Sequence, residues 1–264
     1  MVNLIVCLKQ AIDVTQLKTD QKTRKPLVAD APKKISDFDK NALEEAVRIK
    51  EKQRGKITTI MFGPPEAKTN LREALAMGAD QAYLLTDPSF ENSDTLATSR
   101  ILAKAVRKLG QFDLILCGEA SIDSFAGQVG PQLAEQLHVP VITYTRKLVL
   151  DGNIVTAERN LKDRYETEKT KTPALVTVTK EINEPRIPSL MDIMNASKKP
   201  LITWNADDLQ IPKEKVGKAG LCVKVIEVLA PKTERKRMVI EGKSPQEIAE
   251  KLAKALIQEG VIGR

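Results

Sequence analysis

Short aliphatic runs alternate with amphipathic stretches along the first half of the chain. The runs at residues 4–8, 56–61, 82–85, 114–117 and 139–145 are the length of buried strands. Apolar residues recur between them at helical spacing, which predicts helices over residues 36–54, 65–77, 94–109 and 126–137. Strands and helices that alternate through short connections favour right-handed βαβ units. The fold class is therefore α/β, with a mostly parallel, doubly wound sheet of the Rossmann-like, adenine-nucleotide-binding type.

Punctuating residues support several of these boundaries. Ser36 can cap the first predicted helix, and Asp39 three residues later completes a capping-box-like pattern. Glycine follows three of the helical stretches, at Gly55, Gly78 and Gly110, where it favours helix termination.

The alternation of predicted strands and helices ends after residue 145. Residues 147–155 predict a β-hairpin, residues 165–171 an exposed strand, and residues 173–179 a buried strand that rejoins the sheet. Residues 190–196 have room for two helical turns. Residues 198–230 read as an extended arm lying on another surface. We therefore divide the chain into an α/β nucleotide-binding domain at 1–182 and a partner-recognition loop with a C-terminal arm at 183–264. Ser244 followed by proline and Glu247 predicts a final helix in that arm.

Composition narrows the classes of function. Aromatic residues make up 3% of the chain, too few for a platform that stacks single-stranded nucleic acid. The net charge is +7, but basic and acidic residues are interleaved, and the excess lies at 33–34, 198–199 and 232–237. This favours a phosphate-bearing cofactor or an acidic protein partner over nucleic acid. No apolar stretch approaches a membrane span, so we expect a cytoplasmic protein without membrane insertion.

Catalytic and metal chemistry have little support. The three cysteines, Cys7, Cys117 and Cys222, are far apart in sequence and show no C-x-x-C spacing, so we expect no metal site. Cys7 and Cys117 end apolar runs, which is typical of buried thiols. The single histidine, His138, stands at a predicted helix end, where basic side chains are common.

A loop after the fourth strand is the strongest candidate for a ligand site. Ligands of open parallel sheets bind at the carboxyl ends of the strands. Residues 118–131 follow such an end and are rich in small and hydroxyl side chains, although neither common nucleotide fingerprint is present. Their amides and the Ser121 and Ser124 hydroxyls could receive phosphate oxygens beside a helix N-terminus. An ordinary βα loop with caps explains the residues equally well. Thr95 and Thr98 form a second polar group.

Five segments resemble the β subunit of electron transfer flavoproteins in order and spacing. They are residues 4–13 (L-I-V-C-L-K-Q-A-I-D), 36–46, 74–80 (A-L-A-M-G-A-D), 113–131 and 183–194. Residues 94–99 (D-T-L-A-T-S) and 128–131 (Q-V-G-P) are most similar to the electron-bifurcating branch of that family.

The resemblance implies an electron carrier that forms a heterodimer with an α subunit. The β subunit binds a second nucleotide, either FAD, which we favour, or AMP. Electrons pass from dehydrogenases or NADH to a quinone reductase or ferredoxin, in one branch by flavin-based bifurcation. Leu190 would be the apolar anchor for partner dehydrogenases. The cofactor-binding residues that the resemblance implies are Cys7, Ser36, Asp37, Phe38, Asp39, Phe62, Asp94, Thr95, Thr98, Ser121, Ile122, Asp123, Ser124, Phe125, Ala126, Gly127, Gln128, Val129, Gly130, Pro131 and Gln132.

Two other classes of function stay open. A stand-alone adenine-nucleotide-binding sensor module of related fold would need no second subunit. A nucleotide-dependent ligase would need a phosphate-loop motif and a catalytic constellation, and neither is evident.

Overall fold

The computed structural model describes residues 1–232 and 237–263 and divides into two compact units, Met1–Val228 and Leu229–Arg264. Residues 233–236 of the basic run lie outside the described residues. Residues 183–228 belong to the first unit, and their predicted role toward a partner stays a prediction.

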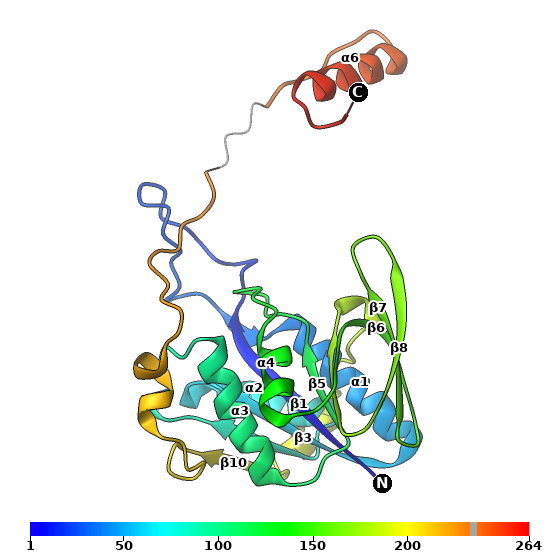
Figure 1. Cartoon of the computed structure of the whole chain (residues 1–264). Coiled ribbons are helices and arrows are strands. Elements are labelled where there is room, and N and C mark those ends of the chain that lie inside the picture. Colours follow the sequence, from blue (N-terminus) through cyan, green and yellow to red (C-terminus); the bar gives the residue numbers. More distant parts are fainter. Residues whose placement is uncertain (233–236, 264) are drawn as a thin grey trace. The chain divides into compact units, whose positions relative to one another are not determined.

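A single mixed sheet forms the centre of the first unit (Figure 1). Within the described residues it has ten strands, in the order β10-β4-β3-β1-β5-β9-β6-β7-β8, with β2 paired to β1. The neighbours from β10 to β6 are parallel, whereas β2, β7 and β8 pair antiparallel. The strands are β1 Val2–Ile12, β2 Lys33–Ile35, β3 Gly55–Phe62, β4 Gln81–Leu85, β5 Leu114–Gly118, β6 Val141–Asp151, β7 Ile154–Asn160, β8 Tyr165–Lys171, β9 Ala174–Val178 and β10 Leu201–Trp204.

Helices cover both faces of this sheet. The helices of the first unit are α1 Asp37–Gln53, α2 Lys68–Met77, α3 Thr95–Leu109, α4 Val129–Leu137 and α5 Leu190–Ala196. One core cluster joins one sheet face to α1 and α2, and a second joins the other face to α3 and α4. The aliphatic runs supply the strands' buried side chains, and the helices' apolar stripes close over them. The predicted doubly wound α/β class is confirmed.

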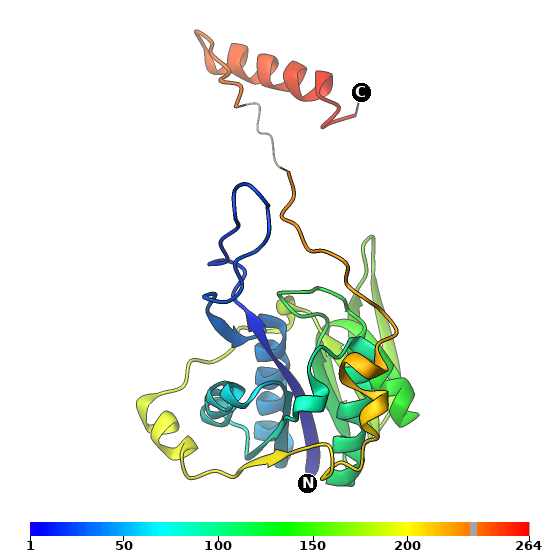
Figure 2. The ribbon, with the colours of Figure 1, turned by 90° about the vertical axis from the view of Figure 1, so that its left-hand side faces the viewer.

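The order of the strands creates a switch point between β1 and β5. After β1 the chain builds outward through β3 and β4, and it then returns to place β5 on the other side of β1. The helices that follow these strands leave toward opposite faces, which opens a crevice at the strands' carboxyl ends. Figure 2 shows β1 running through the middle of the unit.

Three local expectations are wrong. Ser36 occupies the N-cap of α1, but its side chain makes no capping bond. That helix ends at Gln53, its C-cap is Arg54 with a positive φ of 53°, and Gly55 begins β3. The helix expected from residue 126 begins at Val129. The Ser36 hydroxyl accepts the Ile122 amide and the Arg54 carbonyl accepts the Val2 amide, so contacts with distant segments replace two of these local signals.

The prediction of an extended arm over residues 198–230 is also wrong in part. Residues 201–204 form β10, which pairs parallel with β4 at the edge of the sheet. Further along, Ala206, Leu209, Ile211 and Val216 are buried in the α3-side core. A four-residue strand is too short to show a periodic pattern, so β10 could not be predicted from hydrophobic periodicity.

The opposite edge strand, β8, alternates between exposed and half-buried positions. Four residues of β8 are charged: Glu166, Glu168, Lys169 and Lys171. Arg159 of β7 forms an ion pair with Glu168. The predicted hairpin and exposed strand are thereby confirmed.

The second unit contains α6, Pro245–Gln258. The Ser244 hydroxyl accepts a hydrogen bond from the Glu247 amide at 3.2 Å, so the predicted helix start is confirmed. Its apolar residues stay accessible: Ile248, Leu252 and Ile257 are each exposed by more than a third.

Candidate functional site

A cavity of about 640 Å³ opens at the carboxyl ends of β1 and β5. Cys7, Leu8 and Lys9 line it from β1, and Cys117 and Gly118 line it from β5. It thus lies at the topological switch point, where open α/β sheets bind ligands. Its volume falls within the range of small-molecule and cofactor sites.

Most of the predicted site residues meet at this cavity. Those that line it are Cys7, Asp39, Phe62, Asp94, Thr95, Thr98, Ser121, Ser124, Ala126, Gly127, Gln128, Val129 and Gly130. Those outside its lining are Ser36, Asp37, Phe38, Ile122, Asp123, Phe125, Pro131 and Gln132. Ser36 and Ile122 lie outside the lining but hold part of it in place. The Ser36 hydroxyl accepts the Ile122 amide at 3.3 Å and thereby joins the start of α1 to the loop.

Lys9 is a lining residue that the sequence prediction missed. Among the described residues that line the cavity, it is the only basic one. Its ammonium group contacts the Asp123 carboxylate at 2.6 Å and the Ser121 hydroxyl at 3.2 Å. A signal existed, since Lys9 directly follows the first buried run at a strand's carboxyl end. A cation at this place can neutralise part of the charge of a phosphate.

Asp123 fixes the loop by accepting hydrogen bonds from both Lys9 and Ser121. Ser121 donates its hydroxyl proton to Asp123 at 2.7 Å. The hydroxyls of Ser121 and Ser124 lie 2.8 Å apart, so Ser124 is the donor of that pair, because Ser121 has only one proton to give. Burial opposes ionisation of Asp123, but the bonds from Lys9 and Ser121 outweigh it and lower the pKa of the carboxyl. The loop is therefore held to β1 through a charged pair.

Asp39 joins the two strand ends from behind. Its carboxylate accepts the Lys9 amide at 2.8 Å and the Gly118 amide at 3.0 Å. Burial raises the pKa of Asp39 to about 7, although both amide bonds favour the charged form. The expected capping role is wrong, since this side chain connects α1 to β1 and β5 instead.

Gly118 allows this close approach. A Cβ atom there would lie 2.6 Å from both the Asp39 Oδ1 and the Phe38 Cβ, a separation that real Cβ atoms do not show. A residue without a side chain is therefore required where β5 meets the start of α1.

Asp94 organises the opposite wall. One carboxylate oxygen caps α3 by accepting the Ala97 amide at 2.8 Å. The other accepts the amides of Cys222 and Val223 at 2.7 and 3.2 Å, which brings Val223 and Val225 to the cavity. These valines were missed in the sequence, where their alternation at residues 221–225 was the available signal. Thr95 donates to the Gln128 side chain at 2.8 Å and so joins α3 to the loop.

Two cysteine thiols lie in the wall of the cavity. Cys7 and Cys117 are free and buried on neighbouring strands, as expected. The hydrogen bond with Cys7, together with burial, raises the pKa of the Cys117 thiol. A thiol that stays protonated is a weak nucleophile and a weak metal ligand. Within the described residues, no group of three or more His, Cys, Asp and Glu side chains is placed to hold a metal.

Leu190 belongs to a different surface. It lies on α5, outside the cavity lining, and it is 74% exposed. Met191, Ile193 and Met194 of the same helix are more than half exposed, and we call these four side chains the α5 apolar face. In Figure 2, α5 (yellow) lies at the left of the first unit and the β6–β8 strands (green) lie at the right.

No helix in the described part of the chain is long and apolar enough to cross a membrane.

Comparison with known proteins decides the family. Residues 27–209 match the model of the electron transfer flavoprotein domain. This chain belongs to the electron transfer flavoprotein family. It is 46% identical to the electron transfer flavoprotein subunit beta of Thermoanaerobacterium thermosaccharolyticum over 241 residues, 91% of this chain and 92% of the relative.

Two further relatives span nearly the whole chain. The electron transfer flavoprotein subunit beta of Megasphaera elsdenii is 36% identical over 268 residues, 98% of this chain and 99% of the relative. The caffeyl-CoA reductase-Etf complex subunit CarD of Acetobacterium woodii is 36% identical over 260 residues, with the same coverage. The resemblance to electron transfer flavoprotein β subunits, and with it a function in electron transfer, is confirmed. β subunits of this family form heterodimers with an α subunit.

Proposed function

We propose that this chain binds an adenine nucleotide in the cavity between β1 and β5 and, with an α subunit, relays electrons between redox enzymes. The observation that carries the proposal is the cavity at the switch point, where a hydroxyl-rich loop, a lysine and the start of α3 converge. Electrons would come from dehydrogenases or NADH and leave to a quinone reductase or ferredoxin. The three free cysteines favour a reducing compartment, so we place the protein in the cytoplasm.

The cavity's chemistry fits the parts of an adenine nucleotide. Cys7, Phe62 and the segment at 36–39 would surround the adenosine. The loop at 121–132 would hold the phosphates, with Lys9 supplying positive charge beside Ser121. Thr95 and Thr98 would face the isoalloxazine ring of a flavin.

We favour FAD over AMP as the occupant. The lining continues past the phosphate loop to Thr98 of α3 and to Val223 and Val225, and this additional wall suits a dinucleotide better than a mononucleotide. The bound flavin supplies the redox chemistry, while the protein sets its position and electrostatic environment. A second flavin per heterodimer is also the composition that flavin-based bifurcation requires.

The α5 apolar face is the proposed contact for redox partners. Leu190 is its most exposed member, and a large apolar anchor of this kind fits a pocket on a partner protein. One relative is named as a subunit of a caffeyl-CoA reductase complex. A flavoenzyme that acts on CoA esters is accordingly the partner class that we propose.

Counting nucleotides tests the proposal. The chain is co-expressed with its α subunit, and the purified complex is denatured for analysis of FAD and AMP. We expect two flavins per heterodimer. One flavin with one AMP would overturn the choice of FAD, and a stable monomer carrying ATP would favour the sensor module.

A paired substitution tests the location. Replacing Asp123 and Gln128 with alanine removes the Lys9 partner and the Thr95 partner, and should release the β-subunit nucleotide while the α-subunit flavin stays bound. Asp163→Ala, which changes an exposed carboxylate in the hairpin region, is the matched control. Unchanged nucleotide content in the double variant would show that this loop is not the site.

A further inference from the structure

The α5 helix is too short to hold its own position. It has seven residues, and only Ala196 among them is buried. Ser189 and Asp192 form a capping box at its start, which stabilises the first turn. An isolated helix of this length is nevertheless marginal in water. The orientation of its four exposed apolar side chains must therefore be set by residues outside the helix.

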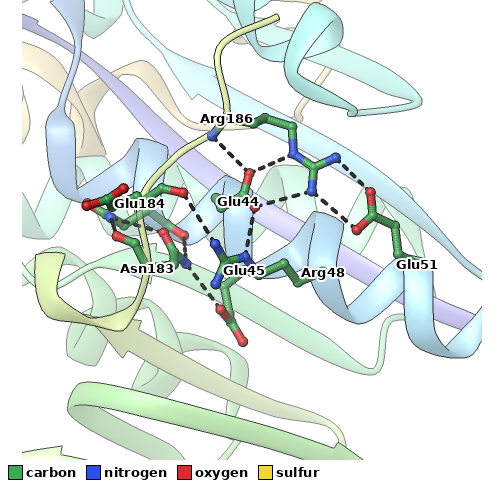
Figure 3. A network of polar contacts seen from close by, with 8 residues as sticks. Glu44, Glu45, Arg48, Glu51, Asn183, Glu184 and Arg186 are labelled. Carbon is green, nitrogen blue, oxygen red and sulfur yellow. Dashed lines mark hydrogen bonds and ion pairs between the residues drawn. The ribbon is translucent and has the colours of Figure 1, made fainter.

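Arg186, four residues before α5, anchors the segment that leads into it (Figure 3). Its Nε donates to Glu44 of α1 at 2.7 Å, and its backbone amide donates to the same carboxylate at 3.2 Å. Its two terminal nitrogens reach Glu51 at 2.7 and 3.3 Å. The Glu44 side chain is only 4% exposed, and Arg48 donates to it at 2.8 Å. A buried carboxylate paired in this way restricts the guanidinium to one geometry.

Asn183 adds a second attachment to the same helix. The Asn41 side-chain amide donates to the Asn183 carbonyl at 2.7 Å, and the Asn183 side chain donates in return to the Asn41 carbonyl at 3.1 Å. It also donates to Glu45 at 3.1 Å. The Asn183 and Arg186 side chains therefore both point toward α1 (Figure 3).

The far end of α5 is held by α2. Arg72 donates through one nitrogen to the carbonyls of Ala196 and Lys199 at 3.0 and 3.2 Å. In the opposite direction, the Lys199 ammonium donates to the carbonyls of Leu75 and Ala79 at 2.8 and 2.7 Å. The last carbonyls of both helices thus receive charged donors, which is favourable at helix C-termini.

We propose that Arg186 with Glu44, and Arg72 at the other end, are positioning residues for partner recognition. They hold α5 so that its apolar face meets the CoA-ester flavoenzyme already in the docking orientation. Pre-organisation of this kind removes the ordering cost that a loose segment would pay on binding. The inference rests on the proposed docking function of α5, and it assigns to Arg186 and Arg72 a role in support rather than in contact.

Four variants of the heterodimer with the α subunit test this inference. Arg186→Gln breaks the attachment to α1, and Arg72→Gln breaks the attachment to α2. Leu190→Ala removes the proposed contact without touching either attachment. Arg164→Gln, at an exposed arginine that pairs with Glu166 on the hairpin, is the control. Amide hydrogen exchange over residues 187–197 and affinity for the cognate CoA-ester dehydrogenase are measured for each, together with nucleotide content.

We expect Arg186→Gln and Arg72→Gln to speed exchange across residues 187–197 and to weaken partner binding about tenfold, with nucleotide content unchanged. Arg186→Lys should restore part of the affinity, because it keeps the charge but loses the forked contact. Leu190→Ala should weaken binding by a similar or larger factor with exchange unchanged. The control should alter neither.

Each failure has a distinct meaning. If Leu190→Ala leaves partner affinity unchanged, the docking function of α5 is wrong. If both arginine variants leave exchange and affinity at wild-type values while Leu190→Ala weakens binding, the positioning role is wrong and docking stands. Should Arg186→Gln unfold the subunit by removing one of the two arginines that pair with the buried Glu44, the Arg72→Gln variant still decides the question, because Arg72 is exposed.

Discussion

The cavity and the α5 apolar face are built by opposite means. The cavity is a concave site whose place follows from strand order, and the Asp39 side chain joins the main-chain amides at the ends of β1 and β5. The α5 apolar face is exposed, and its position depends on a few charged contacts with α1 and α2. Topology can therefore fix where a ligand binds, whereas a short protruding element needs dedicated side chains to fix how it is presented. This difference predicts that substitutions in one region leave the other intact.

The largest expected effect is that of Asp39 on the pH dependence of the free energy of unfolding. Burial raises the pKa of Asp39 to about 7, whereas the pKa of an ordinary aspartate is 3.8. Between these two pH values the folded chain holds a proton on Asp39 that the unfolded chain has released. The free energy of unfolding must then fall as pH rises from about 4 to 7, by at most roughly 4 kcal/mol from this group alone. Asp39→Asn should flatten that part of the profile.

Chemical denaturation of the wild type and of Asp39→Asn across this pH range is the measurement. The difference between the two profiles isolates Asp39 from Asp94 and Asp123, whose pKa values are lowered and whose contributions have the opposite sign. Parallel profiles would show that this carboxyl ionises normally. Hydrogen exchange of α5 should be the same in both proteins.

Gly118→Ala should damage the cavity next most strongly. The added Cβ would press on Asp39 and Phe38 at the junction of β5 with α1, and overpacking of this kind costs about 1–3 kcal/mol. We expect a lower midpoint of thermal unfolding and loss of the β-subunit nucleotide. Gly152→Ala is a useful comparison, because a Cβ there has no neighbour within 4 Å, although its positive φ adds some strain. Retention of nucleotide by Gly118→Ala at wild-type stability would contradict the crowding seen here.

Ser189→Ala should have the smallest effect and confine it to α5. The hydroxyl accepts the Asp192 amide at 3.2 Å, and loss of such a cap costs about 1 kcal/mol of helix stability. Faster amide exchange in residues 190–196 with unchanged nucleotide content is the expected result. A change in nucleotide content would break the proposed independence of the two regions.

The sequence predicted those parts of the fold that depend on local pattern. The aliphatic runs at 4–8 and 114–117 became β1 and β5, and Gly78 and Gly110 end their helices. The loop at 121–130 could be placed at the cavity because parallel strands bring their carboxyl ends to one edge.

Long-range contacts were beyond that reasoning. Arg54 adopts a conformation that glycine usually supplies, and Asp39 serves two strand ends rather than its own helix. Val223 lines the cavity, and its amide is held there by Asp94, which is 129 residues away in the sequence. Such contacts carry no periodic signature, since each depends on the fold being complete.

The charged outer strand β8 has a consequence for the life of the free subunit. The edge strand of a sheet has unpaired backbone N–H and C=O groups, to which a strand of another chain can add. Such strand addition is a common start of aggregation. Here side chains of both signs occupy the border, including Glu166 and Lys169, so an incoming strand would have to strip water from them. A β subunit made before its α subunit is therefore protected along this edge against the addition of a foreign strand.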